Sequence, residues 1–183
     1  MLRLAENPPM KWPPTNSERA SNRWVVAYCK PRQEKALAWD LMRLKIGYFL
    51  PMVLREISSG GRRRRNLYPL FPSYVFFSGS EQERLRVLKT DRVVRMIDVA
   101  DAQQIRLCDE LTALETAIES SPETIELYPR IVPGAIVRIA TGPMKNMEGV
   151  VLQSHNKRKL WLGVSVLGVG ATIEIHADLV AVD

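Results

Sequence analysis

The segment Pro69-Leu-Phe-Pro-Ser-Tyr-Val-Phe-Phe77 is almost wholly apolar and has the length of one β-strand. Because side chains alternate along a strand, one face is predicted to carry Tyr74 and Phe76. The other face then carries Val75 and Phe77. Both faces are apolar, so each requires a cover. The two covers are either helices on both sides of the sheet or, on one side, a partner protein.

The composition is that of an ordinary globular protein. The chain has 183 residues, of which 46% are hydrophobic and 25% are charged, enough for one large or two small domains. No window approaches the roughly 18 apolar residues of a membrane span, and residues 1–21 lack the apolar core of a secretory signal. We therefore expect a cytoplasmic protein with no membrane partner. Cys29 and Cys108 are far apart with no Cys-x-x-Cys spacing, so neither a disulfide framework nor a zinc site is indicated and both are expected to be reduced thiols. No cofactor is expected.

The charge is distributed unevenly along the chain. Residues 22–95 carry 16 Lys and Arg against 6 Asp and Glu, whereas residues 96–131 carry 2 against 8. A basic body of this kind indicates a polyanionic partner. The alternative is that the basic side chains only solvate the surfaces of helices and hairpins.

The N-terminal part is predicted to alternate strands and helices after a disordered extension, residues 1–21. The apolar run Trp24–Tyr28 predicts a strand, and a helical period follows over Pro31–Ile46. One face of that helix carries Leu37, Leu41 and Leu44. The opposite face is predicted to carry a basic stripe that includes an aromatic residue: Arg32, Lys35, Trp39 and Arg43. Trp39 either packs under a neighbouring segment or stacks on a nucleic-acid base.

A β-hairpin is predicted next, with a strand at Tyr48–Glu56, a turn at 58–61 and a return through Arg62–Arg65. The four arginines either grip phosphates or keep an exposed strand end soluble. Ser80 and Glu83 form a capping box for a short helix, and a strand follows at Val93–Ile97.

A further helix begins at Asp101 and ends near Pro122, burying the apolar series Leu107, Leu111, Leu114 and Ile118. Because hairpins join neighbouring strands, the pattern favours an α+β fold with an antiparallel sheet and flanking helices.

The C-terminal segment, residues 132–183, has no helical period. It predicts a small five-stranded barrel after a linker at 121–131, with strands at Ile136–Ile139, Gly149–Leu152, Trp161–Val166, Thr172–Ile175 and Val180. The two histidines, His155 and His176, have no nucleophile or metal ligand near them in sequence, and no phosphate-binding loop is present. We therefore expect a protein that is not an enzyme.

Two motifs in this order resemble a known family. Gly134 to Val151, with Gly142-Pro143-Met144 between two strands, looks like the KOW motif of small SH3-like barrels. Together with Trp24–Tyr28 and Leu70–Val75, it makes residues 22–183 resemble the NusG family of transcription elongation factors. Tyr28-Cys29-Lys30 and Pro69–Pro72 look more like the specialised, operon-directed RfaH-like antitermination paralogues. The resemblance implies a NusG N-terminal domain at 22–120 and a KOW barrel at 132–183.

The resemblance also implies partners and site residues. It implies that the clamp of RNA polymerase docks on Phe71, Tyr74 and Phe76, so that Tyr74→Ala and Phe76→Ala weaken binding without unfolding the domain. The non-template DNA strand would meet Lys30, Gln33 and Arg92, to which the residues themselves add Arg32, Lys35, Trp39 and Arg43. The barrel loop Leu167-Gly168 would contact a small-subunit ribosomal protein or the termination factor Rho. The protein would act as a monomer.

The sequence is compatible with two alternatives. One is a housekeeping NusG-type elongation or termination factor. The other is a ribosome-associated RNA-binding protein that carries a KOW domain. In this chain the β-branched and glycine-rich runs of residues 132–183 favour strands over the helical hairpin that RfaH can form.

Overall fold

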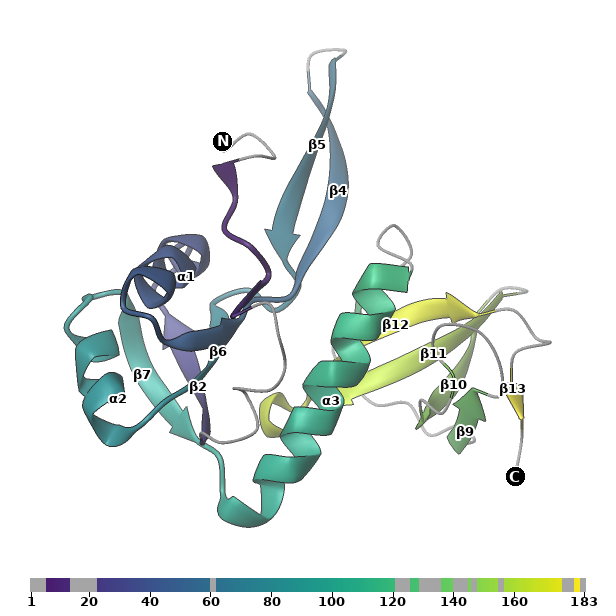
Figure 1. Ribbon diagram of the computed structural model, residues 1–183. Coiled ribbons are helices and arrows are strands. Elements are labelled where there is room, and N and C mark those ends of the chain that lie inside the picture. The colour runs from purple at the N-terminus through teal and green to yellow at the C-terminus, as the bar shows by residue number, and fades with distance from the viewer. Residues whose placement is uncertain are drawn as a thin grey trace. The chain divides into compact units, whose positions relative to one another are not determined.

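The computed structural model describes residues 6–13, 23–59, 62–120, 126–128, 136–139, 145, 148–154, 157–175 and 180–181. The chain divides into two compact units, residues 1–105 and 106–183. In its described residues the first unit holds a five-stranded antiparallel sheet, a two-stranded hairpin and two helices (Figure 1). The predicted α+β class with an antiparallel sheet is confirmed.

The sheet of the first unit has the order β1-β3-β6-β2-β7. Each neighbouring pair is antiparallel, and β2 lies between β6 and β7. The strands are β1 (Lys11–Trp12), β2 (Trp24–Cys29), β3 (Gly47–Phe49), β6 (Tyr74–Ser78) and β7 (Val93–Asp98). The predicted strands at 24–28 and 93–97 are thereby confirmed within one or two residues.

The segment Pro69–Phe77 contains a turn followed by a strand, so the prediction of one continuous strand is wrong at its start. Strand β6 begins at Tyr74, and Leu70 to Ser73 form a turn in which Ser73 has a φ of 68°. Pro72 has no N–H to give to a ladder, so the turn is the favoured place for it. The predicted alternation of faces holds, because Val75 and Phe77 belong to one core cluster and Phe76 does not.

The predicted hairpin is confirmed as β4 (Met52–Ser59) paired with β5 (Arg62–Pro69), with Ser59 opposite Arg62. The predicted strand at 48–56 is broken into β3 and β4 at Leu50 and Pro51. A proline cannot donate to a ladder, which accounts for a break at this place.

Two helices cover one face of the sheet. Helix α1 (Glu34–Arg43) contributes Leu37, Ala38 and Leu41 to the core cluster, and α2 (Glu81–Leu88) contributes Val87. The capping box predicted for α2 is present, with the Ser80 hydroxyl and the Glu83 carboxylate each bonded to the other's backbone N–H. Helix α1 begins three residues later than predicted, because Arg32 has a φ of 64° and lies outside the helix.

The prediction of a disordered extension is wrong for residues 6–13, which form an ordered arm along the sheet. In this arm β1 pairs with β3, placing Lys11 opposite Phe49 and Trp12 opposite Tyr48. The Tyr48 hydroxyl donates a hydrogen bond of 2.9 Å to the Pro9 carbonyl oxygen. Without the arm, β3 would present an unpaired edge of N–H and C=O groups.

Helix α3 (Asp101–Ser120) begins where the sequence predicts, and it buries all four predicted apolar residues. The second unit contains most of α3 and an antiparallel sheet of order β13-β9-β10-β11-β12-β8. Five of its strands fall at or next to the predicted positions: β9 (Ile136–Ile139), β10 (Glu148–Ser154), β11 (Lys157–Val164), β12 (Val169–Ile175) and β13 (Val180–Ala181). The sixth, β8 (Glu126–Tyr128), comes from the segment expected to be a linker and pairs with β12.

Several sequence predictions fall on residues outside those that the structure describes. These are the disordered state of residues 1–5 and 14–21, the turn at 60–61, the motif residues Gly142 to Met144, and the two histidines, His155 and His176.

Candidate nucleic-acid interface

A cluster of polar side chains gathers around one carboxylate at the end of α1. Arg92 and Arg43 each donate to a different oxygen of Asp40, whose side chain is only 15% exposed. Arg92 also donates a hydrogen bond of 2.6 Å from Nη1 to Oε1 of Gln33. Asp40, which was not among the residues predicted from the sequence, thus brings together two of the predicted nucleic-acid residues, Arg43 and Arg92, and Arg92 connects them to a third, Gln33.

Lys30 adjoins this cluster through the backbone. Its N–H donates a hydrogen bond of 2.9 Å to the carbonyl oxygen of Arg92, and its ammonium group lies 2.9 Å from Oδ1 of Asp91. The hydrogen bond from Lys30 and the positive charge of Lys30 lower the pKa of Asp91. Arg92, which is about 60 positions away in the sequence, therefore meets Lys30 and Gln33 at one place on the first unit.

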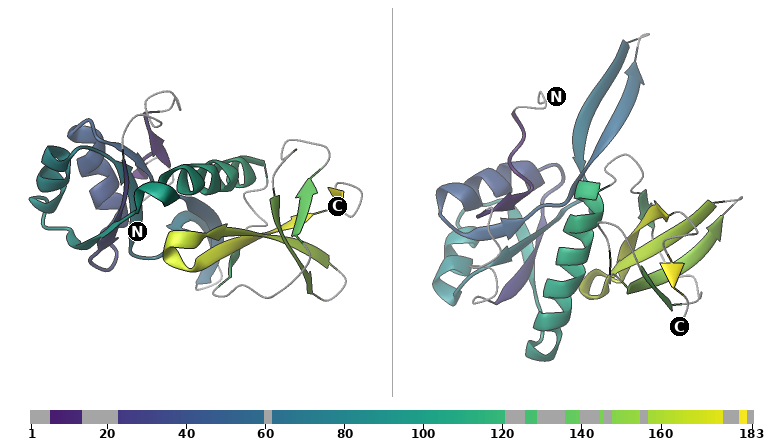
Figure 2. Two further views of the ribbon diagram at one scale, coloured as in Figure 1. Left: turned by 90° about the horizontal axis from the view of Figure 1, so that it is seen from below. Right: turned by 45° about the vertical axis from the view of Figure 1, so that its right-hand side comes forward.

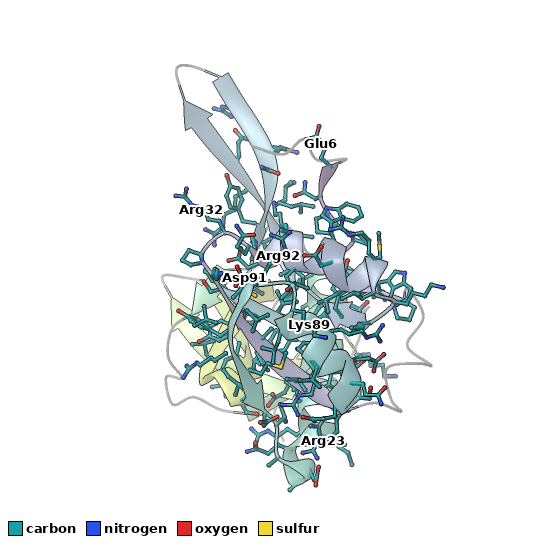
Figure 3. The ribbon with its side chains drawn as sticks, turned by 90° about the vertical axis from the view of Figure 1, so that its left-hand side faces the viewer. Glu6, Arg23, Arg32, Lys89, Asp91 and Arg92 are labelled. Carbon is teal, nitrogen blue, oxygen red and sulfur yellow. The ribbon has the colours of Figure 1, made fainter. Side chains whose placement is uncertain are left out.

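An open pocket of about 460 Å³ extends the cluster towards α2. It is lined by residues from the end of α1, the end of α2 and the loop that leads to β7: Asp40, Arg43, Leu44, Arg86, Lys89, Thr90 and Arg92. Figure 3 shows this side of the molecule, with Lys89, Asp91 and Arg92 labelled. Four cationic side chains and one carboxylate line the pocket, so it favours an anionic ligand.

Sequence reasoning missed Arg86, Lys89 and Thr90 as members of this site. Arg86 and Lys89 are three positions apart, which would place them on one face of a helix, and this is the only signal that the sequence carried. Their approach to α1 depends on the packing of α2 through Val87, which is fully buried. Val87 belongs to the same core cluster as Leu37 and Leu41 of α1, which are more than 40 positions away in the chain.

The residues of the basic stripe predicted on α1 do not form one exposed surface. Lys35 donates hydrogen bonds of 2.6 Å to Oδ1 of Asn7 and 2.5 Å to the carbonyl oxygen of Leu67. Burial lowers the pKa of Lys35, and the neighbouring charge of Glu34 opposes this shift. Lys35 thus connects α1 to the N-terminal arm and to β5. Of the other stripe residues, Trp39 is half-buried. Arg32, which is labelled in Figure 3, is exposed in the loop before the helix.

The aromatic residues predicted to bind polymerase lie on the face of the sheet opposite the α1 core. Phe71 and Phe76 meet edge to face with ring centroids 6.1 Å apart, and they are 2% and 0% exposed. Tyr74 is half-buried, and its ring centroid lies 5.2 Å from that of Tyr28. The guanidinium carbon of Arg95 lies over the ring of Tyr28, 5.4 Å from its centroid. Of the three predicted residues, Tyr74 alone is partly accessible.

The predicted contact residues of the second unit, Leu167 and Gly168, lie at the end of a short 3-10 helix, η3 (Ser165–Leu167). Gly168 is exposed and has a φ of 65°, a conformation that favours glycine. Both the N–H and the hydroxyl of Ser165 donate to Oε2 of Glu110, at 2.9 and 3.0 Å. Leu167 is half-buried.

The described residues contain no cluster of three or more side chains that could hold a metal ion. Burial raises the pKa of the Cys29 thiol to about 12, and the charge of Glu34 adds to this effect. A thiol with such a pKa stays protonated at neutral pH and is a poor nucleophile. Among the helices in the described part of the chain, none is long and apolar enough to span a bilayer.

Comparison with known proteins identifies the family. Residues 22–113, half of the chain, match the family model described as transcription termination factor nusG. The chain therefore belongs to the NusG family, whose members are non-enzymatic transcription factors.

Two solved structures are similar over most of their length, and a search of curated proteins found no match. One, entitled "Domain interaction in Thermotoga maritima NusG", has 17% identity and a TM-score of 0.46 and covers 88% of this chain and 97% of its own. The other, from a crystal structure of an MjSpt4:Spt5 complex, has 15% identity and a TM-score of 0.29 and covers 87% and 95%.

Proposed function

We propose that this protein binds RNA polymerase, suppresses pausing or termination, and contacts the non-template DNA strand as a specialised, operon-directed member of its family. The observation that carries this proposal is the meeting of Lys30, Gln33 and Arg92. The family resemblance assigns these positions to nucleic acid, and they adjoin one another at the edge of a basic pocket. The protein would act only through the free energy of binding to these partners, and no covalent bond would be made or broken.

The polymerase would dock on the aromatic face of the first sheet, with Tyr74 as its accessible anchor. An aromatic side chain buries a large apolar area with few rotatable bonds, which suits it to the centre of an interface. Phe71 and Phe76 are buried, so docking on their rings requires this face to become exposed. The proposed contact therefore begins at Tyr74 and extends to the two phenylalanines as they become accessible.

Tyr74→Ala is expected to weaken polymerase binding at least tenfold, because it removes an anchor ring and leaves the buried core intact. The measurement is affinity for core polymerase, with circular dichroism to verify folding. Tyr74→Phe is the matched control, since it keeps the ring that packs on Tyr28 and is expected to bind like the wild type. Unchanged affinity in folded Tyr74→Ala would show that the polymerase docks elsewhere.

Single-stranded DNA is expected to bind at the basic pocket. The variant Arg43→Gln/Lys89→Gln removes two exposed charges but leaves Arg92 on Asp40. We expect its affinity for a short single strand to fall about tenfold in low salt, and the slope of log affinity against log salt to flatten by about 1.4. Fluorescence anisotropy over a salt series measures both quantities.

The matched control for that experiment is Arg106→Gln/Lys145→Gln, which removes the same charge from exposed positions in the second unit. It is expected to keep most of the affinity. Equal losses in the two variants would mean that net charge, and not the pocket, governs binding.

For the second unit we propose a KOW barrel that binds a small-subunit ribosomal protein or Rho through Leu167-Gly168. The support is its antiparallel sheet of short strands and the exposed glycine that follows η3. A pull-down with the full chain and each purified partner distinguishes the two.

A further inference from the structure

The hairpin of β4 and β5 is the most basic element of the first unit, and the proposed polymerase and single-strand contacts do not use it. Residues 52–69 contain five arginines and one glutamate, a net charge of +4. The hairpin forms its own two-stranded sheet and projects away from the five-stranded sheet (Figures 1 and 2).

The base of the hairpin is fixed to the body of the unit. Met52 and Val53 are buried, and the Leu70 N–H donates a hydrogen bond of 2.8 Å to the carbonyl oxygen of Pro51. On the other strand, Lys35 of α1 donates to the carbonyl oxygen of Leu67, and Asn66 is buried. Because both strands are held at the base, the outer part of the hairpin is presented to solvent in a defined direction.

The outer part presents arginines in a regular spacing. Arg63 lies opposite Ser58 and Arg65 opposite Glu56, so the two arginines share one face. Their side chains are 81% and 59% exposed. Residues two apart on a strand are about 6.8 Å apart, which lets two long guanidinium side chains reach successive phosphates.

The ion pairs that these arginines make with Glu56 are weak. Arg63 and Arg65 approach different oxygens of Glu56 at 3.4 and 3.5 Å, in exposed surroundings. Exposed pairs of this kind contribute little and are screened by salt. A phosphate can therefore replace the carboxylate at small loss.

We propose that the β4–β5 hairpin is a second nucleic-acid contact, which binds double-stranded nucleic acid through its phosphates. A two-stranded ribbon has the dimensions of a groove of the duplex, whereas platforms for single strands stack bases on aromatic rings. The outer part of the hairpin, residues 54–66, contains no aromatic residue, and Tyr68 lies at the base, where it is half-buried. The hairpin therefore favours duplex backbone over single strands. This contact does not depend on polymerase and is separate from the pocket around Asp40.

The test compares a 20-base-pair duplex with a single strand of the same length, using the full chain and no polymerase. In Arg63→Gln/Arg65→Gln we expect duplex affinity to fall about tenfold in low salt and its salt slope to flatten by about 1.8, since two phosphate contacts are lost. Affinity for the single strand should stay within about twofold. Arg43→Gln/Lys89→Gln should show the opposite preference, so the two sites are tested independently.

Two further variants decide what a loss of duplex binding means. Arg63→Lys/Arg65→Lys keeps both charges and is expected to restore most of the affinity, because phosphate contact requires charge more than a planar fork. Arg106→Gln/Lys145→Gln should bind the duplex like the wild type. The proposal is overturned if the glutamine hairpin variant binds duplex normally, if the distant control loses as much, or if the hairpin variant loses affinity only for an acidic polypeptide such as polyglutamate.

Discussion

Phe76→Ala is expected to lower the free energy of unfolding by about 3–5 kcal/mol, because it empties the space of a large side chain that is fully buried. Phe76 lies on the central strand β6, opposite Val26 of β2 and Phe49 of β3, and its ring meets that of Phe71. Close packing on both sides prevents the surrounding structure from collapsing into the space. Urea denaturation of the wild type and the variant measures the difference.

The matched control is Leu85→Ala on α2, whose side chain is 55% exposed and whose loss should change stability by no more than about 0.5 kcal/mol. A change below about 1 kcal/mol in Phe76→Ala would mean that this position is much less constrained than its burial indicates. The expectation from sequence that Phe76→Ala leaves the domain folded is thus opposed by the burial of Phe76. A loss of polymerase binding in that variant would report mainly on stability, which makes Tyr74 the better probe.

Glu34→Ala is expected to destabilise the protein by about 2–3 kcal/mol. Glu34 is only 6% exposed, and its Oε1 accepts a hydrogen bond of 2.7 Å from the N–H of Ser73. Ser73 holds a left-handed conformation at the turn before β6, and its carbonyl oxygen accepts a hydrogen bond of 2.7 Å from Cys29. Removing the carboxylate leaves the N–H of Ser73 without its acceptor, at a residue whose left-handed backbone conformation is already unfavourable. Thermal or urea unfolding measures the loss.

Glu81→Ala provides the comparison for Glu34, since Glu81 also lies in the first turn of a helix but is exposed. Its loss should lower stability only by the smaller contribution of a surface charge near a helix terminus. Glu34→Gln keeps an acceptor oxygen and should fall between the alanine variant and the wild type. If Glu34→Ala and Glu81→Ala have the same effect, the bond to Ser73 does not stabilise the turn.

Sequence reasoning succeeded where the determinants are local. The capping box of Ser80 and Glu83 and the apolar spacing of α3 depend on residues within a few positions of one another, and both elements begin where predicted. The alternation of faces in β6 is also a local property. The start of that strand was misjudged because apolar character continues through the turn at Leu70 to Ser73.

What the sequence did not reveal depends on contacts between distant segments. Lys35 bonds to Asn7 and Leu67, which lie 28 and 32 positions away in the chain. The pocket forms only because the ends of α1 and α2 lie close together. Asp40 was not among the residues predicted from the sequence, yet it accepts hydrogen bonds from two arginines. Hydrophobic period and capping signals carry no information about such pairings.

The arm formed by residues 6–13 extends the folded unit beyond the N-terminal end of the family match. Shared family sequence begins at residue 22, whereas backbone pairing with β3 begins at Lys11 and side-chain bonding to Asn66 begins at Asn7. The first residue of the family match and the first residue of the folded unit are therefore different. A fragment that begins at residue 22 would lack strand β1 of the sheet and the hydrogen bond from Asn7 to Asn66 at the base of the β4–β5 hairpin.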